Sequence, residues 1–424
     1  MKYLVNIFSN IVKISSAFIF FVLITKYNSV EGVGQLGQLL TFSGATLMVA
    51  TLGIQNKLIQ DISLSTKCID INYFTSLFFL SVIFLLSVLA VGKLFFFDIS
   101  LIYGATSNLI FVVFITFIFV VAVFMNFKIA VYSGMENYKK LASINIYGSL
   151  LAVFTTYVFL DIFEGIKYQF YLIMLYPCFR VFFVFFPRND IFQFSNYRLQ
   201  NLKKEIILKN LKSMLPFIVM AIGAALIVHG YQYSVRNLIA SMVDWSYVGQ
   251  WQILQKHSEV STLFYSSLAA VFIIPKLAKL KYAEQLKISK QFASLFFGMG
   301  LLALIIIHQL GSIYIFKVFG NEYKVAGELL ATQLIGDLLK IVAYCYCLNL
   351  ICNSWVKLYL TLEAIQYLLL FISYYICFSY FDKSHMSISY AIAYSIFLFT
   401  VISLCISLKK GIGFGRLLEV GKNP

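Results

Sequence analysis

The chain is dominated by apolar runs of about 20 residues that short polar stretches separate. One of them, residues 71–92, reads INYFTSLFFLSVIFLLSVLAVG without a single charge. An α-helix of this length crosses the hydrocarbon layer of a bilayer and satisfies its own backbone hydrogen bonds there. A membrane β-barrel requires short alternating strands instead. Because hydrophobic residues are 61% of the chain and charged residues only 12%, we predict an all-α integral membrane protein.

The runs predict about twelve transmembrane helices. They fall near residues 7–25, 36–58, 71–92, 107–131, 141–160, 168–187, 213–233, 246–274, 291–310, 326–350, 356–378 and 386–408. Lys and Arg are concentrated in the even-numbered connections and the termini, which predicts that both termini are cytoplasmic. The net charge of +15 is then a topology signal that also favours anionic membrane lipids, and we expect no nucleic-acid partner.

The sequence also contains a weak internal repeat. Val33-Gly34-Gln35 before the second span recurs as Val248-Gly249-Gln250 before the eighth, and Lys140 before the fifth recurs as Lys357 before the eleventh. These matches predict two parallel-repeated six-helix halves, an arrangement typical of alternating-access transporters. The predicted parts are an N-terminal half at 1–190, a cytoplasmic amphipathic linker at 191–212, a C-terminal half at 213–408 and a cytoplasmic tail at 409–424.

Charged residues inside the spans are the candidate site. They are Lys13, Lys128, Arg180, Lys256, Glu259, Asp337, Lys340 and Glu363. A charge at the centre of a membrane helix costs at least about 2.5–3.5 kcal/mol, so we expect these side chains to face a cavity or one another. Because cations outnumber acids, the interior favours an anionic ligand.

Helical spacing groups several of these residues. Gln252, Lys256 and Glu259 share one helix face, as do Gln333, Asp337 and Lys340. Two interpretations stay open for each stripe: it lines an aqueous cleft, or its Lys and its acid neutralise each other as an i, i+3 pair.

The remaining span charges leave similar alternatives. Lys13 and Arg180 have no local acid, which favours a polyanionic ligand or a distant carboxylate, although Arg180 and Lys128 lie where a long side chain reaches the interface. Glu363 stands alone in its span, so it is a candidate proton relay or a carboxyl group hydrogen-bonded to Gln366 or a neighbouring helix.

Several classes of chemistry lack their motifs. The chain has no phosphate-binding GxxxxGK[ST] loop, no HExxH and no serine–histidine–aspartate constellation on an extramembrane loop. Its seven cysteines lie mostly in apolar runs, as small core residues do. We therefore expect neither an enzyme nor a cofactor, metal or disulfide framework.

A set of ordered motifs carries a family resemblance. The strongest are Val248-Gly249-Gln250-Trp251-Gln252, residues 333–340 (QLIGDLLK), and Leu362-Glu363 with Gln366. Weaker ones are Val12-Lys13-Ile14, Gly32-Val33-Gly34, Gly148-Ser149-Leu150, Pro177 and Pro275. In order and spacing, the chain resembles the Wzx-type polysaccharide flippases of the multidrug/oligosaccharidyl-lipid/polysaccharide (MOP) exporter superfamily. Arg180 and Lys128 match no part of that pattern.

The resemblance implies a MATE-like fold and a flippase that moves an undecaprenyl-pyrophosphate-linked O-antigen repeat unit between the leaflets of the bacterial inner membrane. It also implies membrane lipids, a coupling H⁺ or Na⁺, a polysaccharide polymerase and a chain-length regulator as partners. On this basis Lys13, Lys256 and Lys340 are assigned to pyrophosphate or glycan, with Arg180, Lys128 and Gln252 as further candidates. The acids Glu259, Asp337 and Glu363 are assigned to ion or proton coupling.

Two other functions remain in view. A drug/cation antiporter of the same superfamily is the nearest alternative, but a cationic cargo favours an acidic interior. A membrane O-antigen polymerase needs a sizeable extramembrane catalytic loop, and the predicted odd-numbered connections are short.

Overall fold

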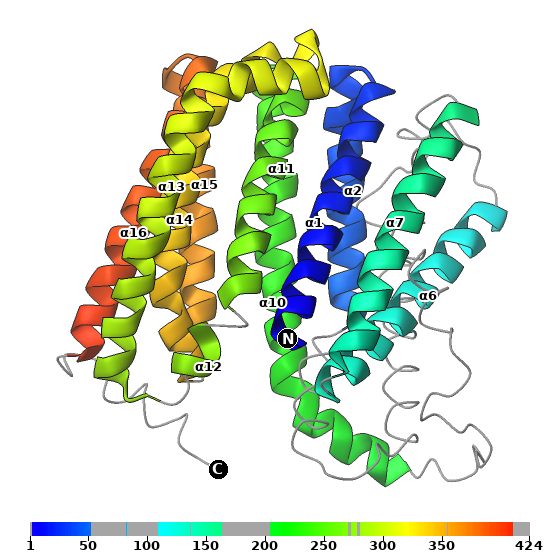
Figure 1. Cartoon of the computed structure of the whole chain (residues 1–424), viewed down its shortest axis with the longest axis vertical. Helices are drawn as coiled ribbons and strands as arrows, with labels where there is room; N and C mark the ends of the chain where they lie inside the picture. The colour runs from blue at the N-terminus through cyan, green and yellow to red at the C-terminus, as the bar shows by residue number, and fades with distance from the viewer. Residues whose placement is uncertain are drawn as a thin grey trace. The chain divides into compact units, whose positions relative to one another are not determined.

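The computed structural model describes residues 2–51, 82, 109–135, 137–162, 204–269, 273–277, 280–353 and 355–409. Figure 1 shows a helical chain throughout these ranges. The helices are α1 (Lys2–Lys26), α2 (Val30–Thr51), α6 (Leu109–Gly134), α7 (Tyr138–Ile162), α10 (Lys204–Met242), α11 (Trp245–Leu268), α12 (Ile274–Leu277), α13 (Tyr282–Phe319), α14 (Lys324–Cys352), α15 (Val356–Tyr380) and α16 (Met386–Lys409). Two 3₁₀ turns, η5 (Asn321–Tyr323) and η6 (Lys383–His385), precede α14 and α16.

The helices follow the apolar runs. Among the described residues, seven helical segments are long and apolar enough to cross a membrane. The predicted all-α membrane fold is therefore confirmed. The predicted span at 71–92, apart from residue 82, and the predicted span at 168–187 lie outside the described residues.

Three helices differ from their predicted spans. Helix α10 runs without interruption from Lys204 to Met242, so it continues well past the predicted end at 233. Within the predicted span 246–274, α11 covers Trp245–Leu268 and the short α12, which contains Pro275, begins at Ile274, while residues 270–272 lie outside the described ranges. Helix α13 covers 38 residues, far more than the predicted 291–310, and ends at Gly320, whose φ of 106° favours glycine.

The chain divides into two compact units, each described by itself. Unit 1 is Met1–Tyr27 with Leu39–His229, and unit 2 is Asn28–Gln38 with Gly230–Pro424. In unit 1, α1 packs on α7, where the Ser16 hydroxyl donates to the Ser149 carbonyl at 3.1 Å. Small residues at this contact let the two backbones approach closely. The predicted linker at 191–212 stays a prediction, although α10 passes through its end.

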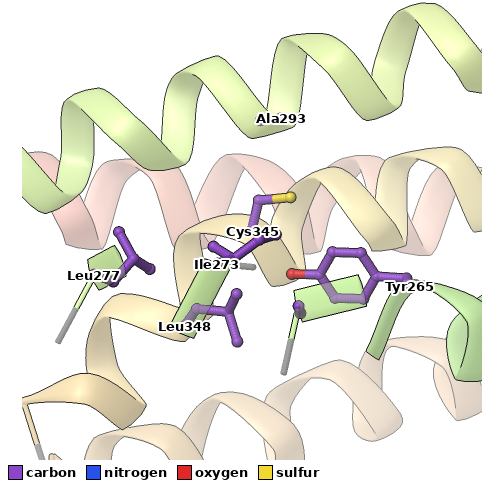
Figure 2. Packing of buried hydrophobic residues seen from close by; sticks show 7 residues of the cluster. Tyr265, Ile273, Leu277, Ala293, Cys345 and Leu348 are labelled. Atoms are coloured by element: carbon purple, nitrogen blue, oxygen red, sulfur yellow. The ribbon is translucent and has the colours of Figure 1, made fainter. Parts of the chain in front are cut away.

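In unit 2, helices α13, α14, α15 and α16 lie side by side (Figure 1). Figure 2 shows part of the core that packs beside them, where Tyr265, Ile273, Leu277, Ala293, Cys345 and Leu348 meet. The rings of Tyr265 and Phe296 pack edge to face, with their centroids 5.2 Å apart. The described cysteines are free thiols, and Cys345 fills this core as a small apolar residue does.

The connection between α10 and α11 is a tight turn. Asp244 caps α11, since its carboxylate accepts a hydrogen bond from the Tyr247 backbone N–H at 2.6 Å. This turn fixes α11 directly against the last turns of α10. It thereby brings the side chains of Arg236 and Gln252 together.

Candidate functional site

Asp337 lies at the meeting point of three helices in unit 2. Its side chain is buried on α14, where Oδ1 accepts a hydrogen bond from the Tyr390 hydroxyl of α16 at 2.8 Å. Oδ2 accepts one from the Ser258 hydroxyl of α11 at 2.9 Å, and Gln333 Nε2 donates to the same hydroxyl at 3.1 Å. Gly336 leaves room for the Tyr390 ring, which a Cβ there would strike. The carboxylate is thus held by hydroxyl donors from two other helices.

Lys340, one turn further along α14, lies against aromatic rings. Its Nζ is 5.8 Å from the centroid of Tyr344 and 5.7 Å from that of Tyr394. Ammonium groups are attracted to the faces of aromatic rings at such distances. Asp337 and Lys340 do not form the i, i+3 ion pair that one of the two interpretations expected, because Asp337 is held instead by the hydroxyls of Ser258 and Tyr390. Lys340 nevertheless interacts electrostatically with Asp337 and Glu259.

Lys256 and Glu259 form an ion pair on α11, the i, i+3 contact that one of the two open interpretations of this helix face expects. Their Nζ and Oε2 atoms are 2.5 Å apart, with side chains 21% and 39% exposed. Glu259 also interacts electrostatically with Arg236 and Lys340. The Glu259 carboxylate is therefore paired with Lys256 and also interacts with the charges of Arg236 and Lys340.

Gln252, predicted to share a ligand-binding face with this pair, has a different partner. Its Oε1 accepts from Arg236 Nε at 3.2 Å and from Nη2 at 2.7 Å. Both side chains are buried, and the guanidinium carbon lies 5.1 Å from the centroid of the Trp251 ring. Gly37 of α2 packs on this pair, since a Cβ there would lie 2.7 Å from Gln252 Oε1.

Arg236 is a buried cation that the sequence interpretation missed. The predicted seventh span ended at 233 because hydropathy falls after that point, which left Arg236 in a connection. The signal that was available is the absence of Gly and Pro between Tyr231 and Met242, which permits α10 to continue.

Glu363 on α15 accepts a hydrogen bond through Oε1 from the Tyr359 hydroxyl at 2.9 Å. Its Oε2 is buried without a hydrogen-bond partner among the described residues. One alternative expected a hydrogen bond between Glu363 and Gln366, but Gln366 has other partners. It donates through Nε2 to the hydroxyls of Tyr344 at 3.1 Å and Tyr394 at 2.9 Å.

The other predicted site residues belong to unit 1 or lie outside the described ranges. Lys13 is exposed on α1. Lys128 on α6 is 6% exposed, with Nζ 5.9 Å from the Phe124 ring centroid. Arg180 lies outside the described residues. In the described part of the chain, no group of His, Cys, Asp and Glu is placed to hold a metal ion.

Comparison with solved structures defines the class of fold. The inward-facing conformation of a multidrug resistance MATE family transporter of the MOP superfamily matches with a TM-score of 0.72 at 13% identity, over 97% of this chain and 100% of that one. A MATE transporter from Vibrio cholerae, crystallised as a mutant, matches with a TM-score of 0.64 at 12% identity, over 98% and 97%. The chain therefore has the fold of the MATE transporters of the MOP superfamily.

Curated relatives add a more particular likeness. Two proteins named Lipid III flippase, from Escherichia coli (strain K12) and Shigella flexneri, are each 27% identical over 173 residues. The matched segment covers 40% of this chain and 40% of each relative. No family model matches the chain.

Proposed function

We propose that this protein is a flippase that moves an undecaprenyl-pyrophosphate-linked oligosaccharide, an O-antigen repeat unit, from the cytoplasmic to the periplasmic leaflet of the bacterial inner membrane. The MOP-type fold and the partial likeness to Lipid III flippases support transport of a lipid-linked cargo. Both termini are cytoplasmic in this proposal, and transport proceeds by cation-coupled alternating access.

The observation that carries the proposal is the environment of Lys340. Its ammonium lies 5.8 Å and 5.7 Å from the ring centroids of Tyr344 and Tyr394 and forms no ion pair within the described residues. A pyrophosphate supplies negative charge that such a group can bind, and binding is strong where water is scarce. A cationic drug meets repulsion at the same position.

Lys256, Lys13, Lys128 and Arg180 are the further candidate ligands of pyrophosphate or glycan. Gln252 acts differently in this proposal, because its carbonyl oxygen already holds the Arg236 guanidinium. It positions Arg236, which joins the cationic set.

The acids are assigned to coupling of H⁺ or Na⁺. Asp337 is buried and accepts two hydroxyl hydrogen bonds, while Glu363 keeps one oxygen without a partner in the described residues. Glu259 is tied to Lys256 and interacts electrostatically with Arg236 and Lys340. Movement of a cation onto any of these carboxylates changes the local field felt by a bound pyrophosphate.

A drug/cation antiporter remains the alternative, because the structural neighbours include multidrug transporters. A complementation experiment distinguishes the flippase from the antiporter. Cells that lack the gene are complemented with Lys340→Gln, and surface polysaccharide, drug susceptibility and membrane levels of the protein are measured.

The flippase predicts lost surface polysaccharide, lipid-linked units retained on the cytoplasmic leaflet and unchanged drug susceptibility. Lys324→Ala is the matched control, since Lys324 lies on the same helix in an exposed ion pair with Glu328. Normal polysaccharide in the Lys340→Gln strain contradicts the proposal. Periplasmic units left unpolymerised point to a polymerase instead.

A further inference from the structure

Gln366 has an unused acceptor in the interior of unit 2. The side chain is 1% exposed, and its Oε1 has no hydrogen-bond partner within the described residues. Buried amide oxygens are nearly always hydrogen-bonded, because an unsatisfied acceptor loses its hydration without compensation. The oxygen is therefore available to a hydrogen-bond donor from a ligand.

The other half of the Gln366 amide is fully engaged. Nε2 donates to the hydroxyl oxygens of both Tyr344 and Tyr394, so neither phenol directs its hydrogen at that nitrogen. The rings of the same two tyrosines flank Lys340. These four residues, which we call the Gln366 cluster, come from α14, α15 and α16.

The cluster combines four kinds of group in one place. It offers an amide acceptor, phenol hydroxyls, aromatic faces and a single positive charge. A polyprenyl chain has no use for the polar groups, and a cationic ligand is repelled by the Lys340 ammonium. A sugar hydroxyl both donates and accepts, so carbohydrate matches the amide oxygen and the phenols, while the charge matches a phosphate.

We propose that the Gln366 cluster is the subsite for the sugar joined directly to the pyrophosphate, with Gln366 Oε1 accepting a hydrogen bond from one of its hydroxyls. The inference rests on the proposed function, because Lys340 holds the phosphate in it. The shared tyrosines place the sugar next to that phosphate. Gln366, Tyr344 and Tyr394 are then specificity-determining residues.

The test compares ligands with and without the sugar. Purified protein in nanodiscs is titrated with undecaprenyl pyrophosphate, and with the same lipid bearing one galactose or one N-acetylglucosamine. The wild type is expected to bind at least one of the sugar-bearing lipids about tenfold more tightly than the bare lipid. Gln366→Met, which preserves shape but removes the amide, is expected to bind all of them like the bare lipid.

Two controls separate the possible causes. Lys340→Gln is expected to weaken binding of every lipid by a similar factor, because it removes the charge rather than the sugar contact. Tyr344→Phe keeps the ring against Lys340 and removes one hydroxyl, so it serves if Gln366→Met does not fold, and it is expected to reduce the sugar-dependent gain.

The outcomes distinguish the two proposals. If the wild type binds bare and sugar-bearing lipids equally, or if Gln366→Met and Tyr344→Phe weaken all lipids alike, the subsite is overturned while lipid pyrophosphate binding stands. Such a result means that a bound water fills the unused acceptor of Gln366, or that Gln366 only supports the surroundings of Lys340. If the wild type binds no lipid pyrophosphate, the proposed function itself fails.

Discussion

Gly34 and Gly249 lie backbone against backbone where α2 and α11 begin. A Cβ at Gly34 would lie 3.0 Å from the Gly249 backbone nitrogen and 2.6 Å from the Trp245 carbonyl oxygen. A Cβ at Gly249 would meet the backbone of Val30. These glycines are the centres of the two Val-Gly-Gln motifs, so the two motifs that the sequence suggests as a repeat lie in contact.

Replacing either glycine by Ala is expected to destabilise the protein, because the obstructing atoms belong to backbone that cannot rotate away. Gly34→Ala and Gly249→Ala should lower the unfolding temperature in detergent clearly. Gly298→Ala is the matched control, since nothing lies within 4 Å of a Cβ there. Ala is favoured over Gly in a helix by about 1 kcal/mol, so the control should match or exceed the wild type. Equal unfolding temperatures for all variants contradict the close contact.

Arg236 and Gln252 should be energetically coupled. Gln252→Met leaves a buried guanidinium without its side-chain acceptor, whereas Arg236→Met with Gln252→Met removes both groups. We expect the double variant to be less destabilised than the sum of the single variants by about 1–3 kcal/mol in unfolding titrations in mixed micelles. Glu31 and Gln35, an exposed hydrogen-bonded pair on α2, provide the comparison cycle, with coupling near zero. Additive effects at Arg236 and Gln252 contradict the contact.

Asp337 should matter for transport through its charge more than through its hydrogen bonds. Asp337→Asn keeps the shape but removes the charge and turns one acceptor into a donor. Tyr390→Phe removes one donor at a cost of about 1 kcal/mol and leaves the carboxylate. In proteoliposomes, the Asn variant should lose transport driven by an ion gradient, while the Phe variant should retain it. Equal loss in the two variants indicates that hydrogen-bond geometry, and not charge, is what transport requires.

The sequence predicted what depends on local spacing and hydropathy. Apolar runs predicted the helices, and the i, i+3 spacing of Lys256 and Glu259 made the ion pair that forms one of two open interpretations. Asp337 and Lys340 have the same spacing but do not pair, because partners on other helices engage each of them. Such choices depend on which helices become neighbours, and spacing along one helix contains no information about that.

Arg236 illustrates the second limit. Hydropathy marks where a span loses apolar character, but a helix continues as long as its backbone is satisfied and its side chains find partners. Arg236 finds Gln252 and Trp251 on the following helix, so α10 carries a buried charge beyond the apolar run. The contact of Arg236 with Gln252 depends on the turn at Asp244, which brings α11 beside α10.

A charge swap tests whether Lys256 and Glu259 line the transport path or only hold the bundle together as an ion pair. Exchange of the two residues preserves an i, i+3 ion pair on α11, so Lys256→Glu with Glu259→Lys should recover most of the stability that either single change removes. Transport should stay lost if Lys256 binds the anionic cargo, because the positive charge then lies almost one turn away. The same exchange at Lys324 and Glu328, whose side chains are 73% and 59% exposed, should alter neither property. Unfolding temperature and surface polysaccharide are measured for each variant, and recovery of both in the α11 swap assigns the pair to holding the bundle together.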